Sequence, residues 1–144
     1  MITSMFLHAG MGHLVSNMIV LFFAGGGVEK KLGSVSFLVM YIVTGLCGNI
    51  LSVYRSVTQG QVHLSLGASG AVFGMLGTLV VLTVRDRNRL QRGSLQRLFF
   101  GIALSLYNGM TTEGIDQMAH VGGFIAGIVF GLIFIILHPR NSDQ

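Results

Sequence analysis

The sequence has 144 residues and a formal net charge of +4, and 51% of its residues are hydrophobic whereas only 10% are charged. A soluble domain carries about a quarter charged residues, so these proportions exclude a chain that mostly faces water. Most of the 21 glycines lie within apolar runs, which argues against a disordered Gly-rich chain and favours close helix packing in lipid. The composition therefore predicts an all-α fold, a polytopic membrane helix bundle, as a single domain over residues 1–144.

Five apolar segments follow one another along the chain, at 12–27, 34–54, 68–84, 97–110 and 117–137. A membrane span needs about 20 residues, within a range of about 17–25. The second, third and fifth segments reach or nearly reach this length, whereas the first and fourth are short. The backbone of a lipid-exposed segment must be hydrogen-bonded within that segment, so each is predicted to be a helix. The polar stretches between them, VEKKLG, YRSVTQGQVH, RDRNRLQRGSLQ and NGMTTEGID, are interpreted as loops.

The basic residues predict which side of the membrane each loop faces. With five alternating spans, eight of the nine Lys and Arg residues fall on one side, and only Arg55 falls on the other. The basic side is expected to be cytoplasmic, so the 55–67 and 109–116 loops face outward. This distribution accounts for the positive charge without a nucleic-acid partner. The single cysteine, Cys47, has no partner for an internal disulfide and is expected in the core.

Polar residues inside the spans are the functional candidates in a membrane protein. The first segment carries His13 and Asn17, which lie four residues apart and share one helix face. The third begins with the sequence GASG, which contains Ser69, and the fifth carries His120 about one turn from its outer end. The predicted topology puts these four residues at a similar depth, just below the outer surface, on three parallel helices.

Small residues recur at helical spacing on two of these helices and favour close contact between them. A serine hydroxyl and an imidazole at hydrogen-bonding distance are the minimum for an activated nucleophile. Packing of the two stripes would bring Ser69 and His120 together. The stripes are Gly70, Gly74 and Gly77 on the third segment and Gly123, Gly127 and Gly131 on the fifth.

Each of these residues has a simpler interpretation that the residues themselves leave open. Ser69 could be a small packing residue, and His120 could be a hydrogen-bonded interior histidine. His13 and Asn17 could cap and bridge helix ends. His8, His13 and His120 could bind a metal, but no carboxylate or cysteine accompanies them at a recognisable spacing. We therefore predict neither a metal nor a cofactor.

Four segments, HAGMGHLVSNM, GGGVEKKLG, GASGAVFG and AHVGGFIAG, resemble the corresponding segments of the rhomboid intramembrane serine proteases, in the same order. The resemblance runs from about His8 to Leu137. It implies a serine endopeptidase that cleaves transmembrane segments of membrane proteins, with Ser69 as nucleophile and His120 as general base of a two-residue dyad. No carboxylate lies at the place expected for orienting the histidine, so helix packing and Phe73 are expected to hold it.

The resemblance also implies supporting roles for other residues. His13 and Asn17 match the family's HxxxN pair, which helps to form the oxyanion hole. Gly67 belongs to the GxSG motif, and Phe73 stands where the family often has a tyrosine that packs on the histidine. The remaining matches are expected to be structural, with Glu29 pairing near the cytoplasmic helix ends; they are Gly25, Glu29, Gly33, Gly70, Gly123 and Gly127.

The chain departs from the family pattern at its beginning. Rhomboids have at least six spans and begin with a helix and a long outer loop, so we expect a chain truncated at the N-terminus, lacking the first transmembrane helix and most of that loop. By resemblance, the segment 97–110 and the 109–116 loop would form a mobile gate and cap. The expected location is a membrane, most simply a bacterial cytoplasmic membrane, with the site toward its outer face.

Two other functions are alternatives to proteolysis. A catalytically impaired rhomboid-like module would bind or sort membrane proteins, and it would usually lack the serine or the histidine that this sequence has. A small transporter or channel subunit would need charged residues within the spans or two similar halves, and the sequence has neither. The sequence predicts transmembrane proteins and the lipid bilayer as partners and leaves the oligomeric state open.

Overall fold

The computed structural model describes residues 10–60, 68–86, 103 and 116–139. These ranges form the helices α1 (Met11–Val20), η2 (Leu21–Gly25, a π-helix), α2 (Gly26–Leu32), α3 (Ser34–Gln59), α4 (Ser69–Arg85) and α6 (Gln117–Leu137). The predicted all-α fold is confirmed for this part of the chain. By length and composition α3 and α6 can cross a membrane, and α1 and α4 are shorter apolar helices. The predicted segment 97–110 lies, but for residue 103, outside the described residues.

The first helical unit is longer than predicted, and the VEKKL part of the predicted VEKKLG loop is helix. The helices α1, η2 and α2 follow one another directly up to Leu32. Glu and Lys are strong helix formers, and the glycines before them do not end the helix. The break comes at Gly33, whose φ of +80° belongs to the left-handed region that glycine adopts readily. The helix α3 likewise extends past the predicted residue 54 and ends at Gly60, with φ +63°.

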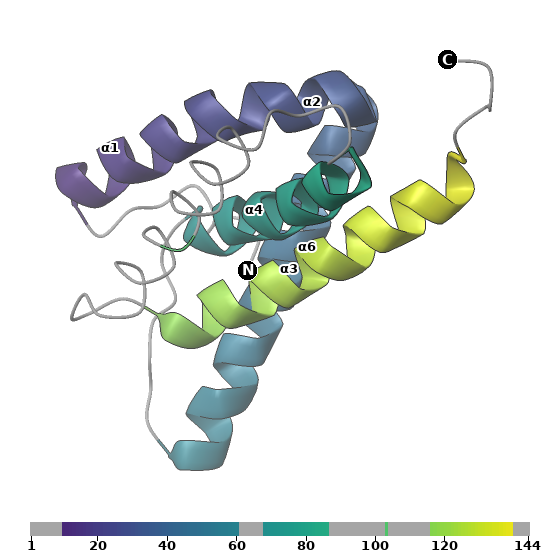
Figure 1. Cartoon of the computed structure of the whole chain (residues 1–144). Helices are drawn as coiled ribbons and strands as arrows, with labels where there is room; N and C mark the ends of the chain where they lie inside the picture. Colours follow the sequence, from purple (N-terminus) through teal and green to yellow (C-terminus); the bar gives the residue numbers. More distant parts are fainter. Residues whose placement is uncertain (1–9, 61–67, 87–102, 104–115, 140–144) are drawn as a thin grey trace.

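The helix α4 lies at the centre of the bundle, between the unit formed by α1 and α2 on one side and α6 on the other (Figure 1). Its residues from Ser69 to Leu79 are all buried. By contrast, α1, α3 and α6 present many exposed large apolar side chains, such as Met11, Val35 and Ile136. Cys47 is also exposed on α3, so its expected place in the core is wrong. Lipid accommodates such apolar outer surfaces.

The glycine stripes bring α4 and α6 into backbone contact. A Cβ atom added at Gly123 would lie closer than 3.0 Å to the carbonyl group of Gly70, and one at Gly127 would collide with Gly74 in the same way. One turn further along α4, Thr78 Oγ1 donates a hydrogen bond of 2.9 Å to the carbonyl oxygen of Gly127. Small residues therefore set the distance between the two helices, as the sequence predicted.

The helix α3 also packs tightly on both α4 and α6, a feature that the sequence analysis missed. A Cβ atom at Gly48 would lie 2.5 Å from the carbonyl oxygen of Ala119 on α6, and one at Gly122 would lie 3.1 Å from the Gly48 Cα. On the other side, a Cβ at Gly74 would collide with the side chain of Thr44. The three helices α3, α4 and α6 therefore form one closely packed unit.

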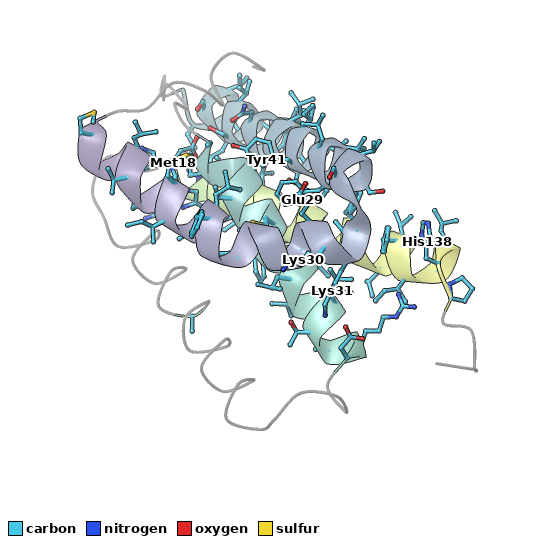
Figure 2. All side chains as sticks on the ribbon, turned by 90° about the horizontal axis from the view of Figure 1, so that it is seen from above. Met18, Glu29, Lys30, Lys31, Tyr41 and His138 are labelled. Atoms are coloured by element: carbon cyan, nitrogen blue, oxygen red, sulfur yellow. The ribbon has the colours of Figure 1, made fainter. Side chains whose placement is uncertain are left out.

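Polar contacts tie the C-terminal ends of α2, α4 and α6 together. Lys31 at the end of α2 forms an ion pair with Asp86 at the end of α4. Arg85 Nη2 donates a hydrogen bond of 2.7 Å to the carbonyl oxygen of His138, just after α6. Figure 2 shows Lys31 and His138 at these helix ends. Arg55, near the end of the antiparallel α3, lies at the opposite end of the bundle beside the first turn of α6.

Candidate active site

Ser69 is the first residue of α4 and is buried, with 7% of its surface exposed. The first hydrogen bond of this helix runs from the Val72 N–H to the carbonyl oxygen of Ala68, at 2.9 Å. The amides that precede Val72 have no partner within the helix, and they give a helix N-terminus its partial positive charge. Negative charge that develops on an oxygen beside Ser69 would therefore be stabilised there.

His120 lies in the first turn of α6 and is 2% exposed. Its imidazole stacks on the ring of Phe73, with 4.1 Å between the ring centroids and an interplanar angle of 5°. Phe73 follows Ser69 by one helical turn, and residues four apart lie on the same helix face with Cβ atoms about 5–6 Å apart. The imidazole therefore lies against the face of α4 that carries Ser69.

Backbone contacts beside these two residues hold α4 and α6 at the same level. A Cβ at Gly70, the neighbour of Ser69, would lie 3.4 Å from the carbonyl oxygen of Ala119, the neighbour of His120. The Gly123 contact with Gly70 lies one turn further along α6. The turns that carry Ser69 and His120 therefore lie against each other, at a helix distance that a side chain at Gly123 would increase.

Asn17 is buried on α1, with 7% of its surface exposed. Its amide nitrogen, Nδ2, has no hydrogen-bond partner among the described residues. A buried donor that is left without a partner costs about 1–3 kcal/mol, so such a group is well suited to bind a ligand oxygen. His13 lies one turn earlier on α1 and is half-buried, and its carbonyl oxygen accepts a hydrogen bond of 3.0 Å from Ser16 Oγ.

Asp116 is a site feature that the sequence analysis missed. Its side chain caps α6 by accepting hydrogen bonds of 3.1 Å from the amides of Met118 and Ala119. Its other carboxylate oxygen accepts a hydrogen bond from the hydroxyl of Ser52 on α3. The cap had a recognisable signal, since an Asp just before an apolar run is typical of a helix start. Its link to Ser52 had none.

The remaining candidates lie elsewhere or outside the described residues. Glu29 accepts a hydrogen bond of 2.7 Å from Ser34 Oγ, which joins the end of α2 to the start of α3 far from Ser69. Gly67 and His8 lie outside the described residues. Within the ranges that the structure describes, no group of three or more His, Cys, Asp or Glu side chains could hold a metal ion.

The comparisons with known proteins all point to one family. A family model described as the rhomboid domain matches residues 1–137. Rhomboid protease GluP of Bacillus subtilis is 35% identical over 127 residues, which cover 88% of this chain and 24% of that protein. Rhomboid protease AarA of Providencia stuartii is 30% identical over 155 residues, which cover 93% of this chain and 55% of that protein. RHOMBOID-like protein 1 of Arabidopsis thaliana is 35% identical, covering 99% of this chain and 37% of its own length.

Proposed function

The chain belongs to the rhomboid family, and we propose that it is an intramembrane serine endopeptidase with a Ser69–His120 dyad. It spans between 24% and 55% of the length of the three relatives described above. Because the chain spans only part of these proteins, its activity, substrates and partners are parts of the proposal. Two of those relatives carry the name rhomboid protease, which supports proteolysis as the activity.

The observation that carries the proposal is the stacking of His120 on Phe73, one turn after Ser69. A flat stack at 4.1 Å restricts the tilt of the imidazole without blocking the nitrogens at its edge. Aromatic stacks of this kind contribute about 0.5–1.5 kcal/mol beyond the area they bury. The contact therefore supports the role of a positioned base for His120 rather than that of a histidine that only fills space.

The proposed reaction begins when His120 removes the proton from Ser69 Oγ, which attacks the scissile carbonyl carbon of the substrate. The oxyanion of the tetrahedral intermediate would be stabilised by amides at the start of α4 and by the Asn17 side chain, with His13 as a further donor. His120 then gives the proton to the leaving amine, and the new amine terminus departs. Water, activated by the same histidine, hydrolyses the acyl-enzyme and regenerates Ser69.

The proposed substrates are transmembrane segments of other membrane proteins, since the site lies among helices of a membrane-embedded family. The basic residues Lys31 and Arg85 lie at the C-terminal ends of α2 and α4, and the excess of Lys and Arg on this side supports an orientation with that end in the cytoplasm and Ser69 toward the outer face. We propose a bacterial cytoplasmic membrane, supported by the relatives from Bacillus subtilis and Providencia stuartii. Relatives from Arabidopsis thaliana include one described as mitochondrial, so an organelle membrane is the alternative.

Cleavage of a transmembrane substrate by the purified chain tests this function. We expect Ser69→Ala and His120→Ala each to abolish cleavage, and the double variant to be no worse than either one, because the two residues act as a unit. Cleavage by Ser69→Ala at the wild-type rate would refute the mechanism. Substrate that is retained but never cut, equally by wild type and Ser69→Ala, would indicate a binding or sorting module instead.

A further inference from the structure

We propose that Asp116 and Ser52 are positioning residues for His120, which together fix the first turn of α6 on α3. This inference rests on the proposed function, because it concerns the direction in which the imidazole of His120 meets Ser69. It goes beyond the dyad by assigning a carboxylate that acts on the helix carrying the base.

The first observation is how Asp116 divides its two carboxylate oxygens. One oxygen accepts from the amides of Met118 and Ala119 and caps α6. The other accepts from the hydroxyl of Ser52, which is 3% exposed on α3. An uncapped helix start frays because its first amides have no intrahelical partner. Here the same side chain both prevents that fraying and attaches the helix start to a neighbouring helix.

The second observation is a backbone contact just beyond the cap. The carbonyl oxygen of Ala119 would lie 2.5 Å from a Cβ at Gly48, a residue that precedes Ser52 by one turn on α3. Residues four apart share one helix face, so Gly48 and Ser52 present the same side of α3 to α6. The hydrogen bond and the close contact therefore hold the turn that leads into His120 at two successive points.

His120 follows Asp116 by four residues, and its amide donates a hydrogen bond of 3.3 Å to the Asp116 carbonyl oxygen. The stack on Phe73 sets the plane of the imidazole, but a flat stack does not by itself define the position of the ring within that plane. The position of the helix start determines where along that plane the ring lies. A displacement of about 1 Å between reacting groups can cost on the order of 10²-fold in rate. We call the Asp116 cap and its hydrogen bond to Ser52 the clamp. Loss of the clamp should therefore lower turnover.

Four variants test the clamp. Asp116→Ala removes both functions, and Ser52→Ala removes only the bond between helices. Asp116→Asn keeps an oxygen that can accept from the cap amides and an NH₂ group that can donate to the Ser52 hydroxyl. This variant should therefore retain the activity that Asp116→Ala loses. Thr58→Ala is the matched control, since Thr58 is an exposed α3 residue whose hydroxyl donates a hydrogen bond of 2.9 Å to the carbonyl oxygen of Arg55.

At matched folded amounts, we expect Asp116→Ala to lower kcat on the order of 10-fold to 10²-fold with KM unchanged. Ser52→Ala should fall between this variant and wild type, and combining the two should be no worse than Asp116→Ala alone. Asp116→Asn should stay within a few-fold of wild type, and Thr58→Ala should be unchanged. Wild-type kcat in Asp116→Ala would overturn the proposal, and so would equal losses in the Asn and Ala variants.

Amide hydrogen exchange gives a second measurement that does not depend on cleavage. The amides of Met118 and Ala119 should exchange faster in Asp116→Ala than in wild type, and in Asp116→Asn they should stay protected. Unchanged exchange in Asp116→Ala would overturn the clamp by itself. If the wild-type chain cleaves no substrate, the proposed function fails, while the exchange measurement still decides whether Asp116 holds the start of α6.

Discussion

Adding a single methyl group at Gly123 should separate the helices that carry Ser69 and His120. In Gly123→Ala the new Cβ would lie 2.8 Å from the carbonyl carbon of Gly70 and closer still to its oxygen, whereas ordinary contacts are 3.4–4 Å. The obstacle is backbone, which cannot rotate away as a side chain can. The two helices must therefore move apart by at least about half an ångström at this level, and such overpacking typically costs about 1–3 kcal/mol.

The consequence for activity follows from the position of Gly123, one turn after His120. Separation of the helices would lengthen the path between the imidazole and Ser69, and a displacement of about 1 Å can cost on the order of 10²-fold in rate. We expect Gly123→Ala to lower kcat by that order for the folded fraction. Gly127→Ala meets a similar obstacle at Gly74, so it should lose comparable stability. It should lose less activity, because Gly127 lies one helical turn, about 5.4 Å, further from His120 than Gly123 does.

Gly27→Ala on α2 is the matched control for this pair. Nothing lies within 4 Å of a Cβ at Gly27, and replacing a helix-interior glycine by alanine gains up to about 1 kcal/mol. The assay combines thermal unfolding in detergent with cleavage kinetics normalised to folded protein. Wild-type stability and activity in Gly123→Ala would refute the account of the helix contact, as would an equal loss in Gly27→Ala.

Three further predictions follow from the site and the topology. Asn17→Ala should keep measurable cleavage but lose on the order of 10²-fold in kcat, the usual cost of one oxyanion donor, and an unchanged kcat would remove Asn17 from the site. Phe73→Leu should lower kcat by up to about tenfold, because a stack contributes about 0.5–1.5 kcal/mol. Phe73→Tyr should keep activity, and equal kinetics for the Leu and Tyr variants would argue against a role of the stack. In a Cys47→Ala background, an impermeant thiol reagent should label a cysteine at Gln59 in intact cells and one at Lys30 only after permeabilisation; the reverse pattern would invert the topology.

The features that sequence predicted well are those with a repeating physical cause. The glycines on α4 and α6 recur at helical spacing, and that spacing leaves a continuous groove along one face of each helix. The structure accordingly brings Gly70 to Gly123 and Gly74 to Gly127. The juxtaposition of the Ser69 and His120 helix faces follows directly from the same pattern.

The features that sequence did not predict depend on single residues or on contacts between elements. The helical VEKKL stretch ends because Gly33 adopts a positive φ, which polarity does not reveal. Cys47 is apolar enough for either side of α3, because lipid and bundle interior are both apolar, so its exposure could not be predicted. The bond from Ser52 to Asp116 joins residues 64 positions apart, and no periodicity relates them.

The central claim is that His120 activates Ser69, and covalent labelling with a fluorophosphonate probe tests it most directly. The probe reacts with activated serine hydroxyls and needs no knowledge of the natural substrate. We expect one adduct per wild-type chain, located at Ser69 by peptide mass spectrometry, with no adduct in Ser69→Ala and a large loss of labelling rate in His120→Ala. Labelling at another residue, or an unchanged rate at Ser69 in His120→Ala, would contradict the account.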